Sequence, residues 1–171
     1  GLASASLTGR RIGVLRRQVG RHAGIKQVFE AALADLRKAG AVLVDLDYQP
    51  DGAMFRDESL VLRYELKRDL NAYLASSPVA IPVRSLAEVI AFNSTHAETE
   101  LRWFGQETFE AANLLNDEPA YRAARANSLR LAGPEGIDRL LSEHDVTLLI
   151  APTERPAWPI DLVTGDHFIS I

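Results

Sequence analysis

The feature that most constrains the fold lies near the start of the chain, where two short apolar runs flank an amphipathic stretch. The runs are residues 11–15 (Arg-Ile-Gly-Val-Leu) and residues 41–46 (Ala-Val-Leu-Val-Asp-Leu). Between them, apolar residues spaced three and four apart share one helical face; they are Ile25, Val28, Phe29, Ala32, Leu33 and Leu36. Gly40 follows where a left-handed helix C-cap favours glycine. This order predicts a right-handed βαβ unit and therefore a parallel sheet.

Two further helices are predicted in the first half of the chain. A long helix is expected from Asp51-Gly52 to about Tyr73. Ser85-Leu-Ala-Glu88 matches a capping box, in which the serine hydroxyl accepts a free backbone N–H and the glutamate reaches back. A second helix should therefore begin at this serine.

The second half of the sequence predicts more helices and then a third strand. Trp103, Phe104 and Phe109 are expected on one helical segment, and Pro119 in the first turn of the next. That helix, capped by Asp117 or Glu118, should run towards Gly133-Pro134, with a short amphipathic piece after it. The third strand is expected over residues 146–151, before Pro152. We therefore expect an α/β fold, a three-layer α/β/α piece with a small, mainly parallel sheet of about three strands and several long helices.

Composition excludes several classes of function. The 171 residues fit one domain. The net charge of −4 argues against nucleic-acid binding, and the absence of cysteine rules out disulfides and thiolate chemistry. No apolar run approaches the ~20 residues that span a bilayer, so no membrane partner is expected. The compartment is not readable from the sequence, although the cytoplasm is favoured.

The sequence motifs predict no metal site and no cofactor. The four histidines show no i, i+4 pair, and no phosphate-binding glycine loop is present. No Gly-x-Ser-x-Gly or Ser-x-x-Lys motif is found. His144 is expected in a structural role at a helix end. Most carboxylates should form a solvated face; Glu65, between Tyr64 and Leu66, is the candidate for pointing towards a pocket.

The end of the third strand provides the candidate binding residues. Ligands of open α/β sheets collect beyond the carboxyl ends of the strands. Thr153 and Trp158 follow the third strand and are therefore predicted to bind substrate at the edge of a pocket. The alternative is that Trp158 packs in the core and Thr153 caps a turn.

An ordered set of motifs runs through essentially the whole chain. They are Leu7-Thr-Gly-Arg-Arg-Ile-Gly-Val-Leu15, Phe29-Glu-Ala-Ala-Leu-Ala-Asp-Leu36, Tyr64-Glu-Leu-Lys67, Leu70-Asn-Ala-Tyr-Leu74, Ser85-Leu-Ala-Glu-Val-Ile-Ala-Phe-Asn93, Gly136-Ile-Asp138, Ala151-Pro-Thr153, Pro156-Ala157 and Gly165-Asp166. In this order and spacing they resemble the middle-to-late part of an amidase signature hydrolase. The similarity is greatest to the bacterial amidase and peptide-amidase branch.

The resemblance implies one large α/β/α domain that hydrolyses amides with a Ser–cis-Ser–Lys triad and an oxyanion hole. Residues 1–171 would then be a single partial domain, a segment of that larger domain. The Gly/Ser-rich signature stretch is absent, and Lys26, Lys38 and Lys67 match later helices of the family. No catalytic residue is therefore expected in this chain, which alone should be inactive.

The expected function is thus that of an amidase segment, with a small amide or a peptide C-terminal amide as the substrate. Self-association through exposed sheet edges is expected if strands are missing. Two other interpretations stay open. One is a segment of a glutamyl-tRNA amidotransferase A-type subunit, and the other is a free-standing α/β binding or interaction module.

Overall fold

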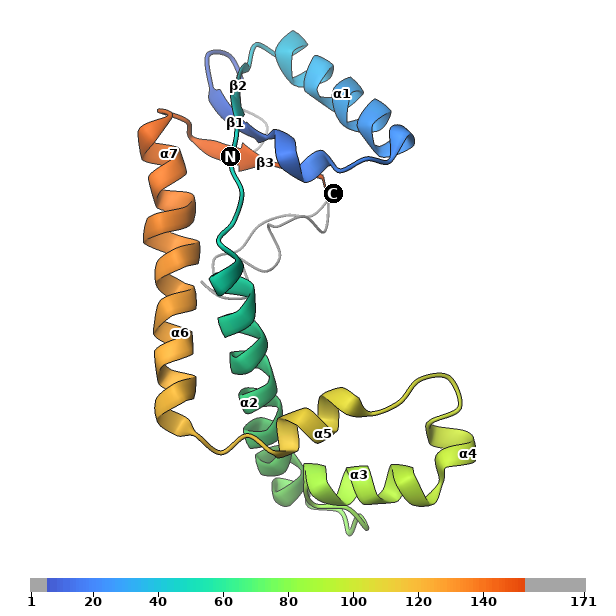
Figure 1. Ribbon diagram of the computed structural model, residues 1–171. Coiled ribbons are helices and arrows are strands. Elements are labelled where there is room, and N and C mark those ends of the chain that lie inside the picture. Colours follow the sequence, from blue (N-terminus) through green and yellow to red (C-terminus); the bar gives the residue numbers. More distant parts are fainter. Residues whose placement is uncertain (1–5, 153–171) are drawn as a thin grey trace. The chain divides into compact units, whose positions relative to one another are not determined.

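A computed structural model describes residues 6–152 (Figure 1). These residues form two compact units. The sheet unit comprises residues 6–55 and 127–152, and the helical unit comprises Arg56–Ala126. Within the described residues, no helix combines the length and the apolarity needed to cross a membrane. The single partial domain expected for residues 1–171 stays a prediction.

The sheet unit is built on three parallel strands: β1 (Arg11–Leu15), β2 (Val42–Leu46) and β3 (Leu148–Ile150). Their order is β2-β1-β3, so the first strand is central. Gly13 lies opposite Val44 on one side and Leu149 on the other. The predicted α/β fold with its small parallel sheet is confirmed.

Alternate side chains of the strands bury on opposite faces of the sheet. Leu15 and Leu46 cluster with Tyr48 and with Leu140 of α7 (Arg139–Glu143). Ile12 lies three residues before Leu15, so it points to the opposite face of the sheet, where it is also buried. Figure 1 shows α7 and α1 (Ala23–Lys38) on opposite sides of the sheet. This is the expected helix–sheet–helix layering.

Gly13 is required by the packing at the centre of the sheet. A Cβ atom there would lie 2.6 Å from Leu149 Cδ2 and 2.7 Å from Leu46 Cδ1. Such distances are far shorter than van der Waals contact, so any larger residue would force these two core side chains to move.

Helix α1 ends as predicted. Gly40 has a φ of +91°, and its N–H donates to Arg37 O at 3.0 Å, while Ala41 N–H donates to Leu36 O at 3.1 Å. These two bonds form a Schellman motif. The apolar face of the helix is only partly covered, however, because Val28 is 72% exposed and Ile25 47%. A helix of 16 residues rises about 24 Å, whereas the five-residue strands beneath it extend about 16 Å.

The helical unit is made of parts of two long helices and three short ones. Its elements are α2 (Gly52–Ser76, from Arg56 onward), α3 (Leu86–Thr95), α4 (Ala97–Glu100), α5 (Glu107–Asn113) and α6 (Glu118–Ala132, up to Ala126). Two predicted caps are confirmed. Ser85 Oγ accepts the Glu88 N–H, and Asp117 Oδ1 accepts the Ala120 N–H at 2.9 Å. In the capping box the Glu88 carboxylate takes the N–H of Arg84 rather than that of Ser85.

Two predictions about helix extent are wrong. Trp103 and Phe104 lie in the loop between α4 and α5, where they are 80% and 79% exposed. Short helices need a buried face for stability, and these rings have none to offer. The helix also does not end at Gly133-Pro134, because a π-helical turn (Gly133–Asp138) leads from α6 into α7. The wider turn accommodates the missing N–H of Pro134 without breaking the helix.

Candidate functional site

The sheet unit contains a hollow of about 350 Å³ beyond the carboxyl end of β2. Tyr48, Gln49 and Asp51 line it from the segment that joins β2 to α2. Its other wall is formed by Leu131, Glu135 and Arg139, which lie four residues apart along α6, the π-helical turn and α7. Residues with that spacing share one face of a continuous helix. The hollow therefore lies at the edge of the sheet where parallel α/β folds place their ligands.

Gly136 is required inside the π-helical turn that forms one wall of the hollow. A Cβ atom at this position would lie 2.7 Å from Leu131 O and 3.6 Å from Tyr48 Oη. The first distance excludes a side chain without movement of the helix backbone. A glycine is therefore needed in the π-helical turn, and the Tyr48 phenol lies close to that turn.

The charged side chains that line the hollow already form some hydrogen bonds and ion pairs with neighbouring residues. Arg139 Nε donates to Glu135 O at 3.0 Å, and Arg139 Nη1 donates to Glu143 Oε2 at 2.9 Å. The Glu135 carboxylate pairs with Arg130. Asp51 Oδ1 accepts the Ala53 N–H at 2.7 Å and so caps α2. These contacts fix the orientation of the side chains that line the hollow.

Tyr48 is the buried polar residue of the hollow, with 7% of its surface exposed. Burial raises the pKa of its phenol, nearby Arg139 acts in the opposite direction, and Asp51 raises the pKa further. The phenol is therefore neutral at physiological pH and can donate a hydrogen bond.

Two arginines follow β1 and pair with carboxylates at the same edge of the sheet. Arg16 Nε donates to Asp45 Oδ1 at 2.7 Å, and the same side chain pairs with Glu30. Arg17 pairs with Asp47, and its guanidinium lowers the pKa of that exposed carboxyl. Exposed pairs of this kind contribute little to stability, but they leave no large excess of one charge at this edge.

The sequence-predicted binding residues Thr153 and Trp158 lie outside the described residues, so their role stays a prediction. Glu65 does not line the hollow. Its Oε1 accepts a hydrogen bond from the Tyr121 hydroxyl at 2.6 Å, and Arg68 Nη2 lies 3.7 Å from the same oxygen. Its role within the helical unit is therefore structural.

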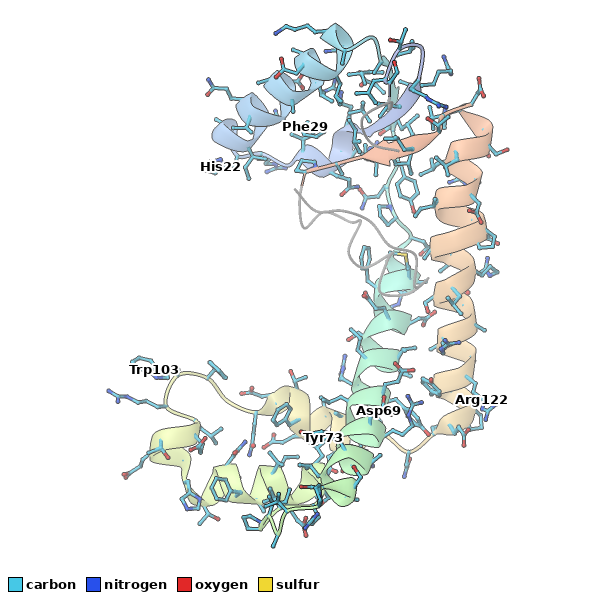
Figure 2. The ribbon with its side chains drawn as sticks, turned by 180° about the vertical axis from the view of Figure 1, so that it is seen from behind. His22, Phe29, Asp69, Tyr73, Trp103 and Arg122 are labelled. Atoms are coloured by element: carbon cyan, nitrogen blue, oxygen red, sulfur yellow. The ribbon has the colours of Figure 1, made fainter. Side chains whose placement is uncertain are left out.

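The described histidines have local structural roles. His22 caps α1 by accepting the Ile25 N–H on Nδ1 at 3.3 Å, at the helix start labelled in Figure 2. His96 stacks on Phe92 at a centroid distance of 4.2 Å. His144 is the C-cap of α7, as expected. Among residues 6–152, no three His, Cys, Asp or Glu side chains are grouped so that they could hold a metal ion.

The residues of the hollow were not among those predicted from the sequence. A signal was available, because Tyr48, Gln49 and Asp51 follow β2 in the same way that the predicted residues follow β3. Glu135 and Arg139 gave no such signal, because the sequence around them predicts only a short amphipathic helix. Tertiary structure alone brings the two walls together.

Comparison with known proteins gives consistent matches. The peptide amidase of Stenotrophomonas maltophilia is 37% identical with a TM-score of 0.82, covering 93% of this chain and 35% of the peptide amidase. An amidase family protein from Bacillus anthracis is 27% identical with a TM-score of 0.73, covering 93% of this chain and 30% of that protein. A probable amidase of Arabidopsis thaliana is 29% identical over 155 residues, which are 87% of this chain and 29% of that protein. No family model matches the chain.

The fold and these matches show that the chain has an α/β scaffold of the kind found in amidases. The chain is related to amidases in both sequence and structure, and the resemblance indicated by its motifs is confirmed. It spans about a third of the length of these relatives.

Proposed function

We propose that the chain is a section of an amidase, an enzyme that breaks a carboxylic amide C–N bond with water and releases ammonia and a carboxylate. The observation that carries this proposal is the 37% identity to a peptide amidase over 93% of the chain, with a TM-score of 0.82. A relationship at this level is compatible with retention of the same scaffold and of the same class of reaction.

We further propose that the substrate is a peptide C-terminal amide or a small amide. The amidase signature resemblance supports a Ser–cis-Ser–Lys centre, with a lysine that activates the attacking serine through the middle serine. In this proposal the catalytic groups come from sequence other than residues 1–171. This chain then supplies scaffold to one larger α/β/α domain, and Thr153 and Trp158 contribute to the edge of the substrate pocket.

A chimera tests the proposal directly. The matched section of the S. maltophilia peptide amidase is replaced by residues 1–171, and ammonia release from a peptide C-terminal amide is measured. We expect the chimera to be active and residues 1–171 alone to be inactive. Circular dichroism and a cooperative thermal transition establish whether the chimera folds. A folded chimera without activity contradicts the proposed function, and turnover by residues 1–171 alone contradicts the proposed source of the catalytic groups.

We also propose that the sheet edges mediate self-association of this chain. Among the described strands, β2 and β3 each pair on one side only, which leaves backbone groups available to another chain. Analytical ultracentrifugation should show a concentration-dependent dimer. Val42→Lys, which places a charge on the outer strand, should shift the equilibrium towards the monomer. A monomer at every concentration would contradict this proposal.

A further inference from the structure

The hollow beyond β2 presents opposite charges that retain unused hydrogen-bonding capacity. Asp51 uses Oδ1 to cap α2, and among the described residues its Oδ2 has no hydrogen-bond partner. Arg139 uses Nε and Nη1, and its Nη2 has no hydrogen-bond partner within residues 6–152. One carboxylate oxygen and one guanidinium N–H group are therefore available to a ligand.

Tyr48 adds a hydroxyl donor to these two charged groups. More than nine-tenths of this residue is buried, its ring belongs to the apolar cluster with Leu15, Leu46 and Leu140, and its side chain lines the hollow. Its backbone carbonyl accepts a hydrogen bond from Gln18, whereas its hydroxyl has no hydrogen-bond partner in the part of the chain that the structure describes. The hydroxyl oxygen is not among the buried side-chain atoms that lack a partner, so it is open to the hollow and can donate a hydrogen bond to a ligand there.

The shape of the hollow restricts what it can hold. A volume of about 350 Å³ is near the lower end of the ~300–1,000 Å³ typical of ligand pockets. The lining carries two carboxylates, Asp51 and Glu135, against the single guanidinium of Arg139, so a dianion such as a phosphate is disfavoured. Leu131 provides an apolar patch. The π-helical turn that forms one wall is a distortion frequently found at functional sites.

We propose that this hollow binds a free α-amino acid in its zwitterionic form. The ammonium group lies against Asp51, and the carboxylate accepts hydrogen bonds from Arg139 and from the Tyr48 hydroxyl. Gln49 offers one further amide group, and the ligand's own side chain packs against Leu131. The proposal does not depend on the amidase activity, because every group it uses belongs to the sheet unit.

Titration of isotope-labelled residues 1–171, followed by ¹H–¹⁵N correlation spectra, tests the binding. The probes are glycine, alanine and leucine, with glycinamide lacking the carboxylate and acetate lacking the ammonium group. We expect saturable shifts with the amino acids in the amides of residues 48–53 and 131–139. Glycinamide and acetate should bind at least about tenfold more weakly, because each loses one charge-assisted interaction. Equal binding of acetate and glycine would contradict recognition of both charges of the zwitterion. The absence of saturable shifts would contradict the existence of the binding site.

Three substitutions separate this site from nonspecific binding. Arg139→Gln removes the guanidinium, Tyr48→Phe removes the hydroxyl but keeps the ring, and Asp51→Asn removes the charge but keeps a good N-cap. Each should weaken amino-acid binding, by about tenfold for the two charged residues. Spectral dispersion shows whether each variant remains folded.

Arg122→Gln is the matched control, because Arg122 also pairs with a carboxylate one helical turn away and projects from α6 in Figure 2. It should leave binding unchanged. Binding that survives all three substitutions in folded proteins, or that Arg122→Gln weakens equally, contradicts the proposal.

Discussion

The sheet unit and the helical unit both bury apolar side chains, but the helical unit also buries two long polar ones. In the sheet unit, Ile12, Val14 and Leu46 are almost completely buried, and they lie on strands whose backbone groups pair with one another. In the helical unit, the buried residues include Glu58 and Gln106. The difference is physical, because a sheet pairs its own backbone polar groups, whereas short helices leave free groups at each end.

Polar side chains satisfy those free groups in the helical unit. Lys67 Nζ donates to Asn113 O at 2.7 Å and to Leu115 O at 2.8 Å, at the end of α5. Arg84 donates to the carbonyl groups of Leu74, Ser77 and Val79. Both units therefore have apolar cores, and in the helical unit long polar side chains also bond to the free backbone groups at helix ends.

The largest expected effect is on the apolar core of the sheet unit. Leu46→Ala should lower the free energy of unfolding by about 2–5 kcal/mol, because it leaves a cavity between the sheet and α7. Denaturant unfolding measures the change. Val42→Ala, on the same strand but 44% exposed, is the control and should have a much smaller effect. Equal losses from the two variants would contradict the apolar core as the main source of stability.

A smaller but clear effect is expected from Gln106 in the helical unit. This side chain donates to Ile90 O at 3.2 Å and to Ser94 Oγ at 3.0 Å, and it accepts from Asn93 Nδ2 at 3.2 Å. Gln106→Leu should lower the free energy of unfolding by about 1–3 kcal/mol, because buried partners lose their hydrogen bonds. The exposed Gln27 provides the control as Gln27→Leu. A gain in stability from Gln106→Leu would show that apolar packing dominates in this unit too.

Glu58 tests whether a buried carboxyl without a hydrogen-bond partner lowers the stability of the folded protein. Its Oε1 is buried without a hydrogen-bond partner among the described residues, and burial raises the pKa of the carboxyl. The folded protein then holds this proton more tightly than the unfolded chain, so stability falls as the pH rises above the ordinary glutamate pKa of about 4.3. Glu58→Met should therefore stabilise the protein by about 1 kcal/mol at pH 7.

The pH dependence provides the check on Glu58. Thermal unfolding of wild type and Glu58→Met is compared between pH 4 and pH 8. The advantage of the variant should grow as the pH rises from about 4.3 through the raised pKa of the folded state, and it should stay constant below and above that window. A variant that is less stable at pH 7 would show that the carboxylate has a favourable partner.

The smallest effects are expected where the two units are alike, on exposed ion pairs within helices. Arg139–Glu143 in the sheet unit and Arg122–Glu118 in the helical unit are both i, i+4 pairs. Arg139→Gln and Arg122→Gln should each lower the free energy of unfolding by only about 0.3–0.5 kcal/mol. The same unfolding assay, repeated at high salt, should remove most of this difference. A loss above 1 kcal/mol at either site would indicate a partly buried pair.

The predictions from sequence succeeded where the signal was local. The βαβ unit, the left-handed Gly40 and the caps at Ser85 and Asp117 follow from residue spacing and from short-range hydrogen bonds. The prediction of a helix at Trp103 and Phe104 failed because apolar residues do not ensure that a surface exists to bury them. Gly133-Pro134 does not end its helix because a π-helical turn accommodates the proline, and residue propensities do not reveal such a turn.

The candidate sites divide in the same way. Thr153 and Trp158 were predicted from their position after a strand, and that prediction remains to be tested. The hollow beyond β2 was missed because its two walls, residues 48–51 and 131–139, are far apart in the sequence. Only one of the walls follows a strand end, so sequence patterns could indicate at most half of the site.

The sequence by itself determined the alternation of strands and helices, the parallel sheet and the kinship with amidases. These follow from periodicity, caps and ordered motifs, which depend on residues close together along the chain. The tertiary structure alone decided that Gln106 and Glu58 would be buried, that Trp103 would be exposed and that Tyr48 and Arg139 would line one hollow. Burial and pairing of this kind depend on contacts between segments distant in sequence, whose free energy no local pattern encodes.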